Sequence, residues 1–116
     1  MIIDRIPLKP LWAPSRAFVE QSNLKKFQNW LFVKKGLYFR DYHDLWDWSV
    51  TDLEDFWESI WQFNDVKSHS MYWDVLVNSK KDFADIQWFR GASISYAEHI
   101  FRHKNANRPA LLYQSE

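Results

Sequence analysis

The sequence predicts a mainly α protein, a small helical module with an extended Pro-rich arm and one or two short strands. Three observations favour this class. Apolar residues recur at helical spacing in several stretches, these stretches begin at residues that can cap a helix, and three of the four prolines lie near the start of the chain. With 116 residues, the chain has the length of one domain and can bury a core without disulfides.

Residues 1–14 are expected to form the extended arm. Each proline fixes its own φ angle and keeps the residue before it out of the helical region. Leu11 and Trp12 are expected to anchor this arm on an apolar surface. The helical domain is predicted to cover residues 15–108, and residues 109–116 are expected to lie outside it.

The first helical pattern begins at Ser15, and Ser22 can cap the helix a second time. Lys34 and Lys35 lie in the last predicted turn and Gly36 follows them, which is typical of a helix C-terminus. The apolar residues of this stretch that recur at helical spacing are Leu24, Phe27, Trp30 and Leu31.

The stretch after residue 50 carries the strongest helical pattern. Thr51 and Glu54 fit a capping box, Thr-x-x-Glu, which predicts that a helix begins there. Its acidic residues are interpreted as a solvated face and as partners of the helix dipole rather than as an acid–base pair. These are Asp52, Glu54, Asp55 and Glu58, and the apolar face expected to pack into the core is Leu53, Phe56, Trp57, Ile60 and Trp61. Core packing is favoured over stacking on bases or a ligand.

The second half of the chain is expected to be less regular. Residues 72–77 form either a strand or a short buried turn, and residues 80–82 form a loop. Ser95 and Glu98 fit a second capping box, which begins the last helix. The apolar edge of that helix is predicted to be Ala97, Ile100 and Phe101, and a short strand is predicted at 110–113.

Composition and charge exclude several classes of protein. The chain has no Cys, so it has no disulfides, and a cytoplasmic location is expected. No apolar run is long enough for a membrane span, and the first residues do not resemble a signal peptide. Residues 1–40 carry eight Lys and Arg, whereas residues 41–65 carry eight acids and no Lys or Arg. The two stretches are expected to face each other or a partner, and a nucleic-acid partner is not expected.

No catalytic, cofactor-binding or metal-binding residue is assigned from the residues themselves. His99 and His103 have the i, i+4 spacing of a helical metal site, but no third ligand accompanies them, so they are interpreted as surface histidines. The two glycines do not form a phosphate-binding loop, and no serine occupies a Gly-x-Ser-x-Gly turn.

Two motifs resemble the N-terminal region of acetoacetyl-CoA synthetases, which belong to the acyl-CoA synthetase group of adenylate-forming ligases. They are "LWDWSVTDLEDFWESIWQF" and, further on, "WFRGASISYAEHIF". The motifs "PLWAP" and "SNLKKF" fit the same pattern, so the resemblance runs from about Pro10 to the end. The family usually reads Leu-Asn where this chain has Ile94-Ser95, and the serine keeps the helix cap.

The resemblance implies an N-terminal domain of the acetyl-CoA synthetase N-terminal type that packs on a catalytic nucleotide-binding domain. It also implies that residues 109–116 are the first strand of that nucleotide-binding domain, which is absent from this sequence. ATP, Mg²⁺ and coenzyme A are then expected only in a full-length enzyme, and this chain alone is expected to be inactive.

Two functions follow as expectations. In the first, the chain is the structural N-terminal domain of a ligase that joins acetoacetate or a similar acid to coenzyme A through an acyl-adenylate. In the second, it is a free-standing protein-interaction module that uses the same aromatic surface. In the first case, an unpaired strand at 110–113 would leave a disordered tail or a strand-mediated homodimer.

Overall fold

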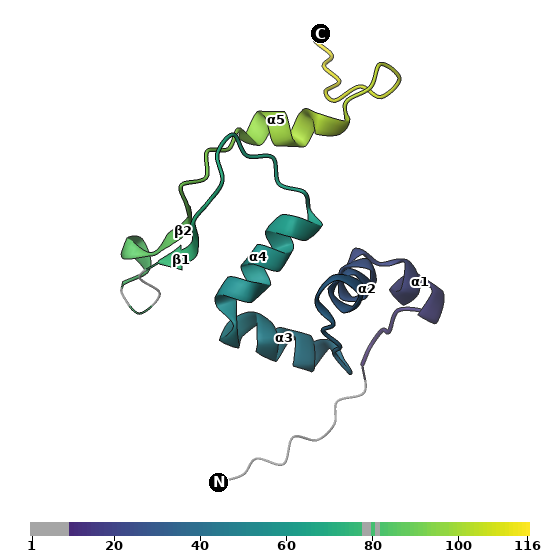
Figure 1. Cartoon of the computed structure of the whole chain (residues 1–116). Coiled ribbons are helices and arrows are strands. Elements are labelled where there is room, and N and C mark those ends of the chain that lie inside the picture. Colours follow the sequence, from purple (N-terminus) through teal and green to yellow (C-terminus); the bar gives the residue numbers. More distant parts are fainter. Residues whose placement is uncertain (1–9, 78–79, 81) are drawn as a thin grey trace. The chain divides into compact units, whose positions relative to one another are not determined.

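The computed structural model describes residues 10–77, 80 and 82–116, and it confirms the mainly α class (Figure 1). The chain forms two compact units, Met1–Arg40 and Asp41–Glu116. No helix in the described part of the chain is long and apolar enough to cross a membrane. Residues 1–9 of the predicted arm lie outside the described residues, and residues 10–14 form no helix or strand.

The first unit contains α1, Arg16–Gln21, and α2, Asn23–Lys35. Ser15 caps α1, since its hydroxyl accepts the N–H of Phe18 at 3.2 Å. The hydroxyl of Ser22 accepts the N–H of Lys25 at 3.1 Å and donates to the carbonyl of Val19 at 2.7 Å. Ser22 therefore closes one helix and opens the next, as its predicted second cap required.

The C-terminus of α2 is also the predicted one. Gly36 has φ 68° and ψ 17°, the left-handed conformation that follows many helices, and its N–H bonds to the carbonyl of Phe32 at 3.0 Å. Phe27 and Leu31 are the buried residues of α2. Leu11 and Trp12 are exposed, so their role as anchors stays a prediction.

The second unit begins with two helices where one was expected. These are α3, Tyr42–Thr51, and α4, Leu53–Phe63. Thr51 ends α3, and its hydroxyl donates to the carbonyl of Asp47 at 2.7 Å instead of capping the helix that follows. The predicted capping box of Thr51 and Glu54 is therefore wrong. Asp41 caps α3 through the N–H of Asp44 at 3.0 Å.

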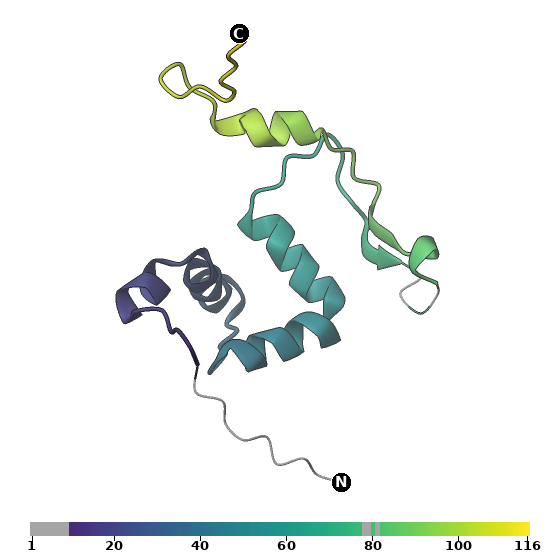
Figure 2. The same ribbon diagram turned by 180° about the vertical axis from the view of Figure 1, so that it is seen from behind.

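An antiparallel hairpin follows α4, formed by β1, Asp74–Val77, and β2, Gln87–Arg90, with the short 3-10 helix η1, Phe83–Asp85, before β2 (Figures 1 and 2). In the register of the hairpin, Asp74 pairs with Arg90 and Leu76 with Trp88. Residues 72–77 were predicted to be a strand or a buried turn, and the strand is confirmed over 74–77. The β2 strand was not predicted.

The last helix is short. It consists of α5, Tyr96–Ile100, and the 3-10 turn η2, Phe101–His103. Ser95 caps it through the N–H of Glu98 at 3.4 Å, as predicted. The predicted strand at 110–113 is not formed, because residues 111–116 have no regular secondary structure and their side chains are exposed. The placement of residues 109–116 in a nucleotide-binding domain stays a prediction.

Candidate functional site

An aromatic cluster joins α4 to the hairpin. On α4, Trp57 and Trp61 stand four residues apart and share a face. Trp57 meets the ring of Trp88 edge-on, with 5.7 Å between ring centroids, and Trp61 lies 4.5 Å from the ring of Phe89. The hairpin is thus held along one side of α4 by ring contacts, which contribute beyond the area that they bury.

Two adjacent hairpin residues reach the same helix because the backbone of Phe89 is left-handed. Successive residues of a regular strand point to opposite faces. Phe89 has φ 46°, which is uncommon for a residue other than glycine, and this twist breaks the alternation. Trp88 and Phe89 can then both contact α4. Such a strained residue persists when its surroundings hold it, and here the ring of Trp61 does so.

Tyr72 extends the cluster and binds one of the acids of α4. Its ring lies 5.3 Å from Trp61 and 5.2 Å from Phe89, and its hydroxyl donates to Oε1 of Glu58 at 2.8 Å. Desolvation, followed by the hydrogen bond and the negative charge of Glu58, raises the pKa of Tyr72 to about 12. Glu58 is therefore a structural acceptor, which corrects its interpretation as a purely solvated acid.

The predicted burial of the α4 face is correct only in part. Phe56, Ile60 and Trp61 are half-buried, whereas Trp57 is 39% exposed. The fully buried residue of α4 is Ser59, whose hydroxyl donates to the carbonyl of Asp55 at 2.6 Å. The remaining acids follow expectation more closely, since Asp52 and Glu54 are exposed and Asp55 is half-buried.

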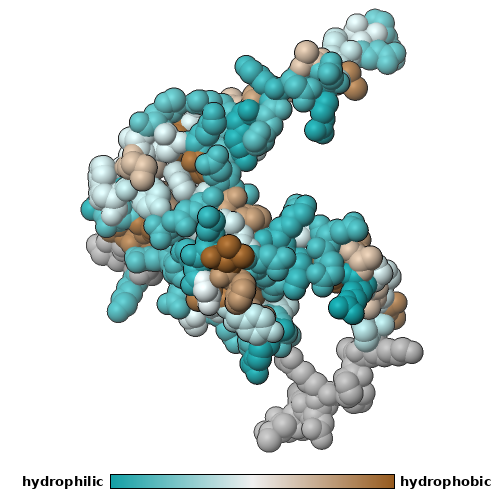
Figure 3. Space-filling view, turned by 45° about the vertical axis from the view of Figure 1, so that its right-hand side comes forward, coloured by the Kyte–Doolittle hydropathy of each residue, from teal (hydrophilic) through white to brown (hydrophobic). Residues whose placement is uncertain are grey.

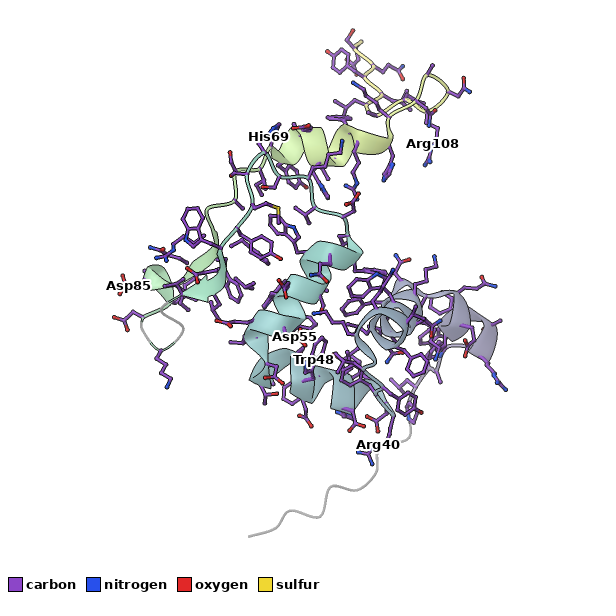
Figure 4. All side chains as sticks on the ribbon, viewed as in Figure 1. Arg40, Trp48, Asp55, His69, Asp85 and Arg108 are labelled. Atoms are coloured by element: carbon purple, nitrogen blue, oxygen red, sulfur yellow. The ribbon has the colours of Figure 1, made fainter. Side chains whose placement is uncertain are left out.

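A set of polar contacts ties α5 to the chain between α4 and β1. His69 Nε2 lies 2.6 Å from Glu98 Oε2, and Figure 4 shows His69 next to α5. The N–H of Lys67 donates to Nδ1 of His99 at 3.3 Å. The guanidinium of Arg102 bonds to the carbonyls of Asn64 at 3.1 Å and His99 at 2.7 Å, so one side chain serves the C-terminal ends of α4 and α5.

These contacts give the histidines and Glu98 structural roles. His99 is half-buried and uses Nδ1 to accept a backbone N–H, while His103 lies in η2 and is exposed. The side chain of Glu98 turns toward His69 and not back to the N–H of Ser95, so only the serine half of the predicted capping box is formed. The predicted apolar edge of α5 does not pack into a core, since Ala97 is exposed, Ile100 is 52% exposed and Phe101 is 42% exposed.

Large apolar side chains are exposed at many points of the second unit, and Figure 3 shows hydrophobic residues scattered among hydrophilic ones. Two of these places are α5 with the segment after it, and the segment between α4 and β1. The exposed residues of the first place are Tyr96, Ile100, Phe101, Leu111, Leu112 and Tyr113, and those of the second are Met71 and Trp73. Surfaces of this kind fit another protein surface better than a small polar substrate.

The described residues form neither a glycine-rich phosphate loop nor a group of three metal ligands. Gly36 ends a helix, and Gly91 lies against Trp73, so neither belongs to a loop that could surround a phosphate. Among residues 10–77, 80 and 82–116, no group of three His, Asp or Glu side chains could hold a metal ion.

Residues 42–100 match the protein family described as Acetyl-coenzyme A synthetase N-terminus. This range begins with the first residue of α3 and ends with the last residue of α5. It includes the aromatic cluster and two contacts, His69 with Glu98 and Lys67 with His99, that join α5 to the chain before β1. The match covers just over half of the 116 residues, and the chain therefore belongs to this family of acyl-CoA synthetase N-terminal domains.

Within this family the chain is similar to acetoacetyl-CoA synthetases. The enzyme of Rattus norvegicus is 35% identical over 107 residues, which are 91% of this chain and 16% of the enzyme. The enzyme of Rhizobium meliloti is 32% identical over 108 residues, which are 93% of this chain and 16% of that enzyme. The solved acetoacetyl-CoA synthetase from Streptomyces lividans superposes with a TM-score of 0.73 at 34% identity, and the match covers 81% of this chain and 14% of that one.

The chain thus spans about a sixth of the length of the curated relatives that it matches. It corresponds to the N-terminal region of acetoacetyl-CoA synthetases, as the two sequence motifs indicated. The motifs located the family correctly, whereas the cap of α3, the β2 strand and the contact between Trp73 and Gly91 were missed. Asp41, three residues before Asp44, was the local signal that could have located the start of α3.

Proposed function

We propose that this chain is the non-catalytic N-terminal packing domain of an acetoacetyl-CoA synthetase-like acid–thiol ligase. The observation that carries the proposal is the outward apolar surface at the point where the family match ends. Ile100 is 52% exposed, and beyond it Leu111 and Leu112 are 87% and 89% exposed. A neighbouring domain that covered these side chains would remove their apolar surface from water.

The partner in this proposal is a catalytic nucleotide-binding domain of the same enzyme. Residues 110–113 would then become a strand by pairing with that domain, because a lone extended segment has unpaired backbone groups. The relatives are long enough to contain such a domain, since the match covers 16% of the rat enzyme and 14% of the Streptomyces chain.

The whole enzyme would join acetoacetate, or a similar short acid, to the thiol of coenzyme A at the expense of ATP. The acid would attack ATP to give an acyl-adenylate and pyrophosphate, and the thiol would then displace AMP. ATP, Mg²⁺ and coenzyme A would all bind outside this chain, because its described residues provide neither a phosphate loop nor a metal site.

The first test uses the chain alone. Titration calorimetry with ATP·Mg²⁺ and an ATP–pyrophosphate exchange assay with acetoacetate should both give the signal of a buffer blank. ATP binding with a micromolar Kd, or exchange above the blank, would overturn the non-catalytic role.

The second test uses a chimera. In the Streptomyces lividans enzyme, the segment that matches this chain is replaced by residues 1–116, and acetoacetyl-CoA formation is measured. We expect a folded chimera that retains ligase activity, whereas the same enzyme with the segment deleted should lose it. An inactive or insoluble chimera would contradict the packing role and favour the free-standing interaction module.

A further inference from the structure

The segment between α4 and β1 presents two large apolar side chains to solvent. Met71 is 79% exposed and Trp73 is 69% exposed, while Tyr72 between them is half-buried against Trp61 and Phe89. Tyr72 packs inward, while most of the surface of its two neighbours stays open to solvent, with Met71 beside a hollow next to Trp61 and Gln62. Met71 and Trp73 are called the Trp73 surface below.

The backbone beneath the Trp73 surface is held by hydrogen bonds to the last residue of β2 and to the chain that follows it. The N–H of His69 bonds to the carbonyl of Ser93 at 2.7 Å, and the N–H of Trp73 bonds to that of Arg90 at 3.0 Å. Ser70 also donates its hydroxyl to the carbonyl of Gly91 at 2.6 Å. A surface fixed in this way loses little conformational entropy when a partner binds.

The indole of Trp73 is fixed as well. Its six-membered ring lies so close to the Cα of Gly91 that a β-carbon at position 91 would overlap it. Gly91 has φ 95°, so both its conformation and its missing side chain suit this contact. The glycine thus supports a ring that is mostly exposed and adds little to the core. Rigid tryptophans of this kind are frequent anchors of protein interfaces, and methionine adapts to varied surfaces.

Charged groups around the Trp73 surface are paired with each other. Arg90 Nη2 lies 2.7 Å from Asp74 Oδ2, and His69 lies 2.6 Å from Glu98. These two pairs lower the positive charge that the neighbouring side chains could present to an anionic lipid surface or a nucleic acid. The Trp73 surface suits an apolar surface on another folded protein region.

We propose that the Trp73 surface docks onto the catalytic part of the same ligase polypeptide, as a second contact besides α5 and the segment after it. This inference rests on the proposed function. The family match includes Met71 and Trp73, and about five-sixths of each relative lies outside the part that matches this chain. A body of that size provides the partner surface in cis, and a contact in cis needs no high affinity because it forms at high effective concentration.

The test measures whether position 71 is covered. The chain contains no Cys, so Met71→Cys introduces one thiol whose labelling rate can be followed by mass spectrometry of its peptide. Phe83→Cys is the matched control, because Phe83 is 90% exposed and lies near the far end of the hairpin. Each variant is labelled in the isolated chain and in the Streptomyces chimera.

We expect the thiol at 71 to react at least about tenfold more slowly in the chimera than in the isolated chain, while the thiol at 83 reacts equally fast in both. Equal rates at 71 in an active chimera would overturn the docking inference and leave the proposed function intact. An inactive chimera would overturn the proposed function and this inference with it. Slow labelling at 71 in the isolated chain, with a rate that falls with its concentration, would assign the surface to a second copy and reject a contact in cis.

A second variant tests the same docking contact without introducing a thiol. Trp73→Ala should lower the Tm of the active chimera by several degrees more than it lowers the Tm of the isolated chain. Equal shifts would show that Trp73 acts only within this domain and would reject the docking inference.

Discussion

The indole of Trp73 lies across Gly91, and its ring occupies the space that a β-carbon at that position would need. The two residues belong to the opposite sides of the hairpin base, and the N–H of Trp73 bonds to the carbonyl of Arg90 next to Gly91. The Trp-Phe-x-Gly motif therefore has a structural reason in this chain. Its glycine allows both the left-handed backbone and the close approach of the ring.

Replacement of Gly91 by Ala should destabilise the second unit. The alanine would be strained at φ 95° and would also displace the indole of Trp73. Gly36→Ala is the control, because Gly36 has φ 68° but a β-carbon added there would meet no atom within 4 Å. We expect the control to lose about 1 kcal/mol of unfolding free energy and Gly91→Ala to lose at least about twice as much, measured by urea unfolding. Adding Trp73→Ala to Gly91→Ala should recover the stability that Gly91→Ala loses beyond the control. Similar losses of stability in the two glycine variants would show that the ring contact is unimportant.

The division between α3 and α4 gives a second prediction. Asp41→Ala removes the side-chain acceptor for the N–H of Asp44 and should cost about 1 kcal/mol of unfolding free energy. Thr51→Ala should cost less than about 0.5 kcal/mol, because this hydroxyl only bonds back to carbonyls within α3, those of Asp47 and Trp48. Chemical denaturation followed by circular dichroism measures both. If Thr51→Ala were the more costly change, the capping-box interpretation would be right after all.

Local signals in the sequence were sufficient for the elements that depend on neighbouring residues. Ser15, Ser22 and Gly36 act through the backbone within a few positions, so the bounds of α1 and α2 could be predicted. The hairpin depends on Trp88 and Phe89 meeting α4, a contact between residues about thirty positions apart. The left-handed φ of Phe89 accompanies that contact, and no propensity of phenylalanine predicts it.

The candidate surfaces show the same limit. The helical spacing at α4 predicted which residues share a face, but not that the hairpin leaves Trp57 partly exposed. Likewise, the capping pattern located Ser95, whereas the pairing of Glu98 with His69 depends on how the chain returns after β2.

Truncation of the two α4 tryptophans should distinguish their burial. Trp61→Ala removes ring contacts with Phe89 and Tyr72 and should cost about 3 kcal/mol, at the lower end of values for a buried aromatic residue. Trp57→Ala should cost about half as much, because 39% of this residue is already exposed. Far-UV circular dichroism during urea unfolding measures both without relying on fluorescence from the eight tryptophans. A larger loss for Trp57 would mean that the hairpin packs mainly through Trp88.

Tyr72 predicts a loss of stability at high pH. Its pKa in the folded chain is about 12, above the ordinary value of 10.0, so the folded state holds the phenol proton more tightly than the unfolded state does. The stabilisation is complete below pH 10 and is lost as the pH rises toward 12. We expect the Tm to fall more steeply over this range than in Tyr72→Phe. Absorbance at the phenolate wavelength should also show a step near pH 12 that this variant lacks, and its persistence in the variant would reject the assignment.

Deletion of residues 109–116 should leave the isolated domain almost unchanged. Leu111, Leu112 and Tyr113 are 87–90% exposed, and the segment forms no strand with β1 or β2. Removal of exposed side chains exposes little new apolar surface, so the Tm should move by no more than about 1–2 °C, the shift expected from a few tenths of a kcal/mol.

In the Streptomyces chimera, Leu111→Asp with Leu112→Asp should instead reduce ligase activity and Tm, because two charges would enter the proposed contact with the catalytic domain. The same double substitution in the isolated domain is the control and should be neutral. A large loss of Tm on deletion would show that the segment completes this domain's own core, and the packing role proposed for it would then fail.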